Sequence, residues 1–352
     1  MKLAPVYAAF AHCKTAKVTQ TIINTGQHYD SEMSKDFIDE LDLHIPDYNL
    51  NVHTKTQAEF VGKSMVEIDK VITRLNSNLI IVYGDTNSTL AGAMVAAKSN
   101  IPLAHVEAGL REFDLSIPEE TNKRAIDAIS NLLFAPSQVA VDQLKSEQAP
   151  GSMHFVGDVT FDLINQLQSA IDATYVTVKN NYNLEDKYIL ATCHRAINTD
   201  HIEKLEAILS ALHNCGRQVI FPVHPRTAKA ITNNGLSDYL KSDNIISIGP
   251  LPYLETQALL KNCTKVVTDS GGLIKEAYFH KVPAIIVDTQ TEWVETVQSG
   301  LHIITGPDSN KILSAIDNHS HIADPIHYYG EGNASHQIVE HCLNYLNRNF
   351  TT

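Results

Sequence analysis

Short apolar runs alternate with longer amphipathic stretches along the sequence, and this alternation restricts the fold more than any other feature. The runs are rich in Val and Ile, and several are apolar at every position. Such runs are typical of parallel strands covered by helices on both faces. The candidate strands are Gln20–Asn24, Leu79–Gly84, Leu103–Glu107, Leu132–Ala135, Met153–Val156, Tyr188–Thr192, Gln218–Val223, Ile245–Ile248, Lys265–Thr268, Ala284–Val287 and His302–Thr305.

Helical spacing falls between these runs, for example in Asp200–His213 and Tyr253–Lys261. Strands that alternate with helices predict an α/β fold with parallel sheets. The strands are too numerous for one ordinary doubly wound domain, so we expect two. The length of 352 residues agrees, because domains average about 150 residues.

We expect the first domain to span residues 1–157 and the second residues 158–334. The boundary is placed near Gly157, directly after a strand, and Asp162–Asn183 is expected to be a polar helix with its connection. Residues 335–352 form the tail. Its apolar residues recur at helical spacing over Ser335–Asn349, which predicts a final packed helix.

Composition excludes several classes of protein. The formal charge of −13 argues against a nucleic-acid binder, although a locally positive pocket still suits a phosphorylated small ligand. The five cysteines form no C-x-x-C pair, which predicts no zinc site and a reducing, cytoplasmic location. No run approaches about 20 apolar residues, so we expect neither a membrane span nor a signal peptide.

Three carboxylates are candidates for proton transfer. Asp85 and Glu107 each follow an apolar strand, and Glu119 follows Pro118 at a helix start. Helix capping and first-turn acids are common, so each residue alone has a structural explanation. Their expected convergence at one sheet edge favours acid–base chemistry.

The second half contains a candidate phosphate site. Asp269 ends a strand, and Ser270-Gly271-Gly272 leads into a helix whose free N–H groups suit an anion. The segment lacks the dinucleotide fingerprint and the P-loop lysine, so neither NAD binding nor ATP hydrolysis follows. Glu276 lies further along this helix and faces either a ribose or water.

Two histidines at strand ends each have an arginine close by. His194 precedes Arg195, and His224 lies two residues before Arg226. Such pairs suit a diphosphate.

Taken together, these segments resemble the non-hydrolysing UDP-N-acetylglucosamine 2-epimerases. The similarity runs from Lys2 to the C-terminus. The hydrolysing relatives have a His-Gly-Gly-Glu pattern where this chain has His105–Gly109. The segments that carry the resemblance are Thr25-Gly26-Gln27-His28, Gly84-Asp85-Thr86, His105–Arg111, Pro118–Asn122, His194-Arg195, Pro222–Pro225 and Asp269–Gly272 with Glu276.

This resemblance implies two Rossmann-like domains facing across a cleft, as in glycosyltransferase-B folds. The second domain would hold UDP, the first would supply acids and bases, and the final helix would return to the first domain. It also implies a homodimer that requires neither metal nor NAD, acting on a UDP-sugar in polysaccharide biosynthesis.

The implied reaction interconverts UDP-N-acetylglucosamine and UDP-N-acetylmannosamine. Anti-elimination of UDP would give 2-acetamidoglucal, and UDP would then add back with C2 protonated from the opposite face. The resemblance assigns catalysis to Asp85, Glu107, Glu119 and His194. It assigns UDP-sugar binding to Lys2, Arg111, Arg195, His224, Ser270, Gly271, Gly272 and Glu276.

The sequence departs from the family pattern at four places. Ile197 replaces a Glu, Val287 stands where Arg is common, and Asp30 replaces a polar residue, often Gln, that is typical of allosterically activated members. The family's first strand and Gly-Thr-Arg-Pro-Glu loop are absent ahead of Lys2. We therefore expect the reading frame to begin upstream and the chain as written to be poorly folded or inactive, unless Gln20–Asn24 shifts to pair directly with Leu79–Gly84.

Three alternatives remain open. Thr291–Trp293 and Phe113 resemble the branch that epimerises UDP-2,3-diacetamido-2,3-dideoxyglucuronate. A retaining glycosyltransferase would share the architecture, although the clustered carboxylates argue against it. The third alternative is a truncated, inactive homologue.

Overall fold

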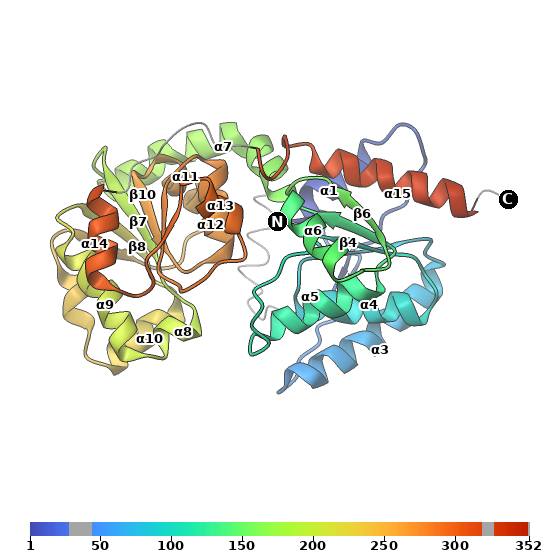
Figure 1. The fold of residues 1–352 in the computed structure, drawn as a ribbon, viewed down its shortest axis with the longest axis horizontal. Helices are drawn as coiled ribbons and strands as arrows, with labels where there is room; N and C mark the ends of the chain where they lie inside the picture. Colours follow the sequence, from blue (N-terminus) through green and yellow to red (C-terminus); the bar gives the residue numbers. More distant parts are fainter. Residues whose placement is uncertain (28–43, 319–326, 351–352) are drawn as a thin grey trace. The chain divides into compact units, whose positions relative to one another are not determined.

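The computed structural model describes residues 1–27, 44–318 and 327–350, and the chain divides into two compact units. Unit 1 comprises Met1–Asn165 with His327–Thr352, and unit 2 comprises Gln166–Ile326. Both have parallel sheets with helices packed against them, so the predicted pair of Rossmann-like domains is confirmed (Figure 1). The chain changes unit inside helix α7 (Val159–Asn181), later than the boundary expected near Gly157.

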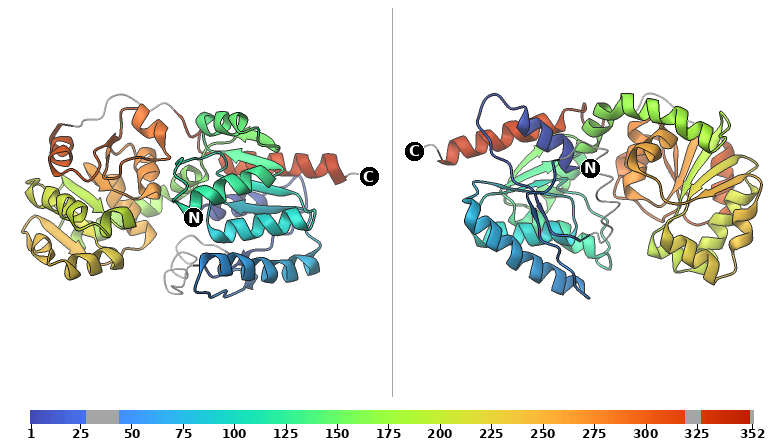
Figure 2. Two further views of the ribbon diagram at one scale, coloured as in Figure 1. Left: turned by 60° about the horizontal axis from the view of Figure 1, so that its bottom comes forward. Right: turned by 180° about the vertical axis from the view of Figure 1, so that it is seen from behind.

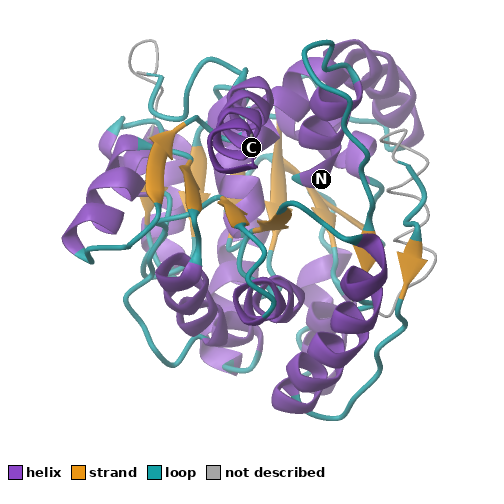
Figure 3. Ribbon diagram, turned by 90° about the vertical axis from the view of Figure 1, so that its right-hand side faces the viewer, coloured by secondary structure: helices purple, strands orange, loops and turns teal. Residues whose placement is uncertain are grey.

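The main sheet of unit 1 has four parallel strands in the order β3-β4-β5-β6. In Figure 3 the strands form a layer between helices on either side. The central strands β4 and β5 are buried at every position, as expected for strands covered on both faces. The strands are β3 (Ile80–Tyr83), β4 (Leu103–Val106), β5 (Leu132–Ala135) and β6 (Ser152–Phe155).

A separate parallel pair precedes this sheet. β1 (Ile23–Asn24) pairs with β2 (Tyr48–Asn49), and among the described residues neither strand pairs with β3. The alternative in which Gln20–Asn24 pairs directly with Leu79–Gly84 is therefore wrong for this part of the chain. Instead, Ile23 and Ile80 belong to one apolar cluster under helices α3 and α4.

The helices of unit 1 cover both faces of its sheet. Helix α15 lies beside α1 and packs on the sheet through Ile338 and Val339 (Figure 2). Asp162 of α7 anchors the start of α15, because its carboxylate accepts hydrogen bonds from the backbone N–H groups of Ala334 and Ser335. Besides α7, the helices are α1 (Leu3–Ala11), α3 (Gln57–Leu75), α4 (Asn87–Lys98), α5 (Pro118–Ile129), α6 (Gln138–Ser146) and α15 (Ala334–Phe350).

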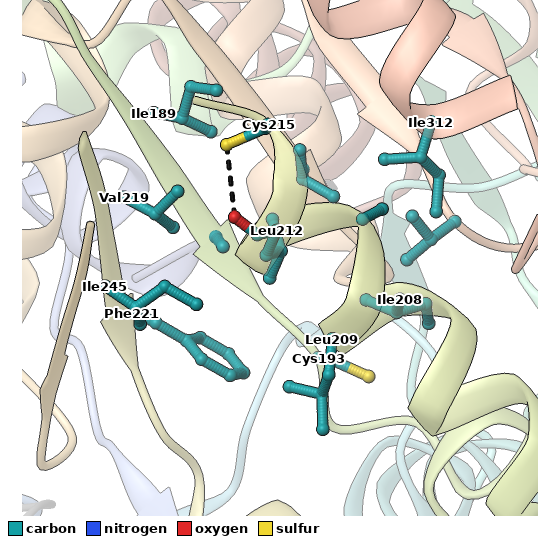
Figure 4. Packing of buried hydrophobic residues seen from close by; sticks show 14 of the residues in the cluster. Ile189, Cys193, Ile208, Leu209, Leu212, Cys215, Val219, Phe221, Ile245 and Ile312 are labelled. Atoms are coloured by element: carbon teal, nitrogen blue, oxygen red, sulfur yellow. Dashed lines mark hydrogen bonds between the residues drawn. The ribbon is translucent and has the colours of Figure 1, made fainter. Parts of the chain in front are cut away.

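Unit 2 has a six-stranded parallel sheet in the order β12-β11-β10-β7-β8-β9. One of its two cores lies between the sheet and α9, where Leu209 and Phe221 are fully buried (Figure 4). The strands are β7 (Tyr188–Thr192), β8 (Gln218–Pro222), β9 (Ile245–Ile248), β10 (Lys265–Thr268), β11 (Ala284–Ile286) and β12 (Ile303–Ile304). The helices are α8 (Ala196–Thr199), α9 (Ile202–Asn214), α10 (Pro225–Asn233), the 3-10 helix η1 (Ser237–Lys241), α11 (Tyr253–Asn262), α12 (Gly271–Phe279), α13 (Val294–Gln298) and α14 (Ser309–Asn318).

Candidate active site

Gly84 and Glu107 follow the carboxyl ends of β3 and β4, and Lys2, the residue before α1, lies beside both. The Lys2 ammonium forms an ion pair with Glu107, whose side chain is 8% exposed. A Cβ on Gly84, which has φ +65°, would lie 2.8 Å from Lys2 Nζ and 3.4 Å from Glu107 Oε2. A side chain at Gly84 would be strained at this φ and would displace the Lys2 ammonium.

The backbone of Glu107 is in the left-handed region. Its φ of 75° is unusual for a residue with a side chain. Such a conformation costs roughly 1–3 kcal/mol and often occurs at functional sites, where the surrounding structure holds it in place. Here it directs a carboxylate from the end of β4 toward Lys2 at the start of α1.

Asp85 has a lysine partner of its own. Lys123 Nζ lies 3.5 Å from Asp85 Oδ2 and 3.8 Å from Glu112 Oε2, and the Lys123 side chain is buried. Asn122 Nδ2 also donates to the Asp85 carbonyl oxygen at 2.8 Å. Two consecutive residues of helix α5, Asn122 and Lys123, thus hold the turn after β3.

Lys123 was not among the residues singled out from sequence. The sequence pattern that could have indicated Lys123 is its position four residues after Glu119, because residues four apart share one helix face. Glu119 itself is exposed in the first turn of α5. The neighbouring Glu120 is buried and accepts bonds from the backbone of Glu112 and from Arg124 Nε, each at 2.8 Å.

Arg111 lies in a buried network rather than on an open surface. Its guanidinium contacts Asp127 Oδ2 at 2.8 Å and both carboxylate oxygens of Glu147 at 2.9 and 2.6 Å. Asp127 also lies 2.7 Å from His105 Nδ1, and His105 Nε2 lies 2.9 Å from the Gly84 carbonyl oxygen. This placement does not favour the predicted contact between Arg111 and a substrate; it favours a role in supporting the turn at Gly84.

Burial alone would raise the pKa of Asp127. The hydrogen bonds from His105 and Arg111, with the positive charge of Arg111, outweigh burial, so the pKa of this carboxyl lies below its usual range. Asp127 is therefore an ionised centre of the network at neutral pH.

In unit 2, Asp269 organises the loop after β7. This fully buried carboxylate accepts the backbone N–H groups of His194 at 3.0 Å and of Arg195 at 2.9 Å, and it also accepts Asn198 Nδ2 at 3.0 Å. The His194 and Arg195 side chains are partly exposed, and Arg195 Nη1 lies 3.2 Å from Asp288 Oδ2. Burial, with help from nearby positive charges, lowers the pKa of His194.

The start of α12 forms an anion-binding geometry. Ser270 caps the helix, and its hydroxyl accepts a bond from Leu273 N at 3.4 Å. A Cβ on Gly271 would lie 3.3 Å from Arg195 Nη2, whereas a Cβ on Gly272 would meet no described residue within 4 Å. A guanidinium therefore lies beside unblocked backbone N–H groups at a helix N-terminus, which suits a diphosphate.

Two further predicted residues lie at strand ends or on α12. His224 follows β8 and caps α10 by accepting Arg226 N at 3.1 Å, with its ring centroid 5.5 Å from that of His194. Glu276 on α12 is buried and accepts Gln257 Nε2 at 2.8 Å. His28 and Asp30, which belonged to the sequence argument, lie outside the described residues.

Within the described ranges, no group of three or more His, Cys, Asp or Glu residues has the geometry to hold a metal ion. In the same ranges, none of the helices combines the length and apolar character that crossing a membrane requires.

The two units have parallel sheets. Unit 1 has ion-paired carboxylates, and unit 2 has a helix start that suits an anion. These features are typical of an α/β enzyme that acts on a phosphorylated ligand. Residues 11–343 match the family model described as UDP-N-acetylglucosamine 2-epimerase, and the chain belongs to this family of isomerases. The resemblance predicted from sequence is thereby confirmed.

Several relatives align over nearly their whole length. A UDP-N-acetylglucosamine 2-epimerase homolog from Methanococcus maripaludis is 43% identical, covering 97% of this chain and 95% of the relative. The UDP-2,3-diacetamido-2,3-dideoxy-D-glucuronate 2-epimerase of Pseudomonas aeruginosa is 38% identical, covering 92% and 91%. The crystal structure of Methanocaldococcus jannaschii UDP-GlcNAc 2-epimerase, in complex with UDP-GlcNAc and UDP, is 38% identical with a TM-score of 0.88 and covers 98% and 96%.

Proposed function

We propose that the chain interconverts UDP-N-acetylglucosamine and UDP-N-acetylmannosamine without net hydrolysis. The observation that carries this proposal is the pair of carboxylates at adjacent strand ends, Asp85 and Glu107, each beside a different lysine. Two separately held carboxylates suit a reaction that removes and returns a proton on two faces of one carbon.

The C2 hydrogen of the sugar is not adjacent to a carbonyl, so simple deprotonation is too difficult. In the proposed reaction a base removes the C2 proton while the C1–O bond breaks. The C2–H electron pair forms the C1=C2 bond, and UDP leaves with the C1–O pair to give 2-acetamidoglucal. UDP oxygen then re-forms the bond to C1 while an acid protonates C2 from the opposite face, so atoms and charge balance over the cycle.

Unit 1 supplies the proton-handling groups in this proposal. Asp85, Glu107 and Glu119 are the catalytic carboxylates, and Lys2 and Lys123 orient the first two. The strained backbone of Glu107 supports this assignment, because strain commonly accompanies a functional constraint.

Unit 2 holds the nucleotide in this proposal. The N–H groups at Ser270, Gly271 and Gly272 and the guanidinium of Arg195 receive the diphosphate, with His194 and His224 beside them. Glu276 binds the ribose. The similar enzyme of Methanocaldococcus jannaschii was crystallised in complex with UDP-GlcNAc and UDP, which supports this choice of ligand.

A second candidate substrate is UDP-2,3-diacetamido-2,3-dideoxyglucuronate. It is favoured by the 38% identity to the Pseudomonas aeruginosa enzyme named for that sugar. Assaying both sugar nucleotides side by side distinguishes the two, since the preferred substrate has the higher kcat/KM.

We further propose a cytoplasmic homodimer that serves polysaccharide biosynthesis. All five cysteines are free thiols, and four of them are buried, which suits a reducing compartment. Light scattering of the purified chain tests the dimer directly; a monomer at all concentrations would contradict it.

The decisive experiment is incubation with UDP-N-acetylglucosamine in deuterated water, followed by NMR of the recovered sugars. Deuterium at C2 of both UDP-sugars is the expected result, because elimination and re-addition exchange that hydrogen. Exchange without epimer, or release of free N-acetylmannosamine with UDP, would contradict the proposal.

A further inference from the structure

Glu276 is held by a row of polar side chains that links two packed helices; Gln257 and Glu276 are buried, and His280 is half-buried. Gln257 on α11 is fully buried, and its Nε2 donates to Glu276 Oε2 at 2.8 Å. Gln257 Oε1 lies 2.9 Å from Nε2 of His280, the C-cap residue that follows α12. Glu276 and His280 are four residues apart, so one face of α12 presents both to Gln257.

This arrangement permits only one orientation of the Gln257 amide. A carboxylate accepts hydrogen bonds, so the amide nitrogen must face Glu276 and the amide oxygen must face His280. His280 must therefore carry its hydrogen on Nε2. Burial, helped by the charge of Lys261, lowers the pKa of His280 to about 4, so at neutral pH the ring is neutral and donates through that one nitrogen.

We propose that Gln257 and His280 are positioning residues that hold the Glu276 carboxylate in one orientation and so set the preference of unit 2 for ribose over a sugar without the 2′ and 3′ hydroxyls. This inference rests on the proposed function, in which Glu276 binds ribose. Two adjacent hydroxyls can donate to a carboxylate only while its oxygens face them. A carboxylate whose orientation is already fixed by a hydrogen bond loses less rotational freedom on binding.

The test is calorimetric titration of the full chain with UDP and with 2′,3′-dideoxyuridine diphosphate. Gln257→Met keeps the side-chain length and removes both hydrogen bonds. We expect UDP affinity to fall about tenfold, the size of one hydrogen bond to a charged group, while dideoxy affinity changes little. In turnover assays KM should rise while kcat stays near its original value.

Two variants of His280 refine the test. His280→Leu removes the donor that fixes the amide, and we expect it to lose part of the ribose preference. His280→Gln restores a donor and should recover that preference, which a merely structural role would not explain. Thr256→Val is the matched control, because the Thr256 hydroxyl bonds within its own helix turn, to the Pro252 carbonyl oxygen at 2.9 Å.

The possible failures are distinguishable. A wild-type chain that prefers UDP, together with a folded Gln257→Met variant of unchanged preference, would overturn this inference and leave the proposed function intact. If Gln257→Met does not fold, the inference is overturned instead when His280→Leu and His280→Gln show the same preference for UDP over the dideoxy nucleotide. A wild-type chain that binds no UDP would overturn the proposed function and this inference together.

Discussion

Lys2 and Glu107 form an ion pair although 105 positions separate them in the chain. One comes from the residue before α1 and the other from the end of β4. Gly84 lies beside both, and a Cβ there would lie 2.8 Å from Lys2 Nζ. This pairing gives the glutamate a charged partner, and the partner's removal is the most direct test of the unit 1 site.

Lys2→Met is therefore expected to lower turnover by about tenfold or more, because the Glu107 carboxylate loses the group that orients it and remains mostly buried. Lys2→Arg should keep part of the activity. Initial rates with UDP-N-acetylglucosamine measure the effect, and far-UV circular dichroism checks the fold. Normal turnover in Lys2→Met would refute this role for the pair.

The three carboxylates are expected to be individually essential for catalysis. Asp85→Asn, Glu107→Gln and Glu119→Gln should each lower kcat by about 10²–10⁴-fold, the usual contribution of general acid–base help. Asp114→Asn is the matched control, since Asp114 is exposed and its carboxylate accepts bonds from the nearby Ser116. Near-normal kcat in all three variants would show that these groups do not handle the proton.

The free energy of unfolding should depend on pH through Asp127. The pKa of this carboxyl is lower in the folded protein than in the unfolded chain, so the unfolded chain takes up the proton first as pH falls. The stabilisation is then complete above the unfolded pKa of about 3.9 and is lost as pH falls toward the folded value. Asp127→Asn should thus be much less stable than wild type at pH 7, with the difference shrinking toward pH 3.

Urea unfolding followed by circular dichroism measures this difference, because the single tryptophan, Trp293, lies in unit 2 and does not report on unit 1. Breaking a buried ion pair costs about 3–5 kcal/mol. If the free energies of unfolding of wild type and Asp127→Asn differ by the same amount from pH 7 to pH 3, the role assigned to Asp127 is contradicted.

Several strands agree with the sequence prediction residue by residue, among them β5, β7, β9 and β10. In β5 and β7 the buried positions leave runs of apolar residues that are typical of strands covered on both faces. In contrast, β2 was missed and β1 is shorter than the expected Gln20–Asn24. Two-residue strands with partly exposed side chains carry no periodicity to detect.

The candidate site also has features that the sequence predicts and features that it does not. Asp85 and Glu107 could be predicted because the carboxyl ends of parallel strands are where ligands bind. Their pairing with Lys2 and Lys123 could not, since each lysine reaches its carboxylate through tertiary packing. The contact between Arg111 and a UDP-sugar, which the family resemblance implies, stays a prediction; in the structure Asp127 and Glu147 bind the Arg111 guanidinium.

The start of α12 offers the last test, because the glycine there lies next to a charged group. A side chain at Gly271 would meet Arg195 Nη2 at 3.3 Å. Gly271→Val is therefore expected to displace the guanidinium and to cover the helix N–H groups, lowering UDP affinity by tenfold or more, about 1.4 kcal/mol. Calorimetric titration with UDP measures the loss. Gly62→Val is the matched control, since Gly62 lies on α3 of unit 1 and a Cβ there would meet no described residue within 4 Å. Unchanged UDP affinity in a folded Gly271→Val variant would show that the diphosphate does not bind at this helix start.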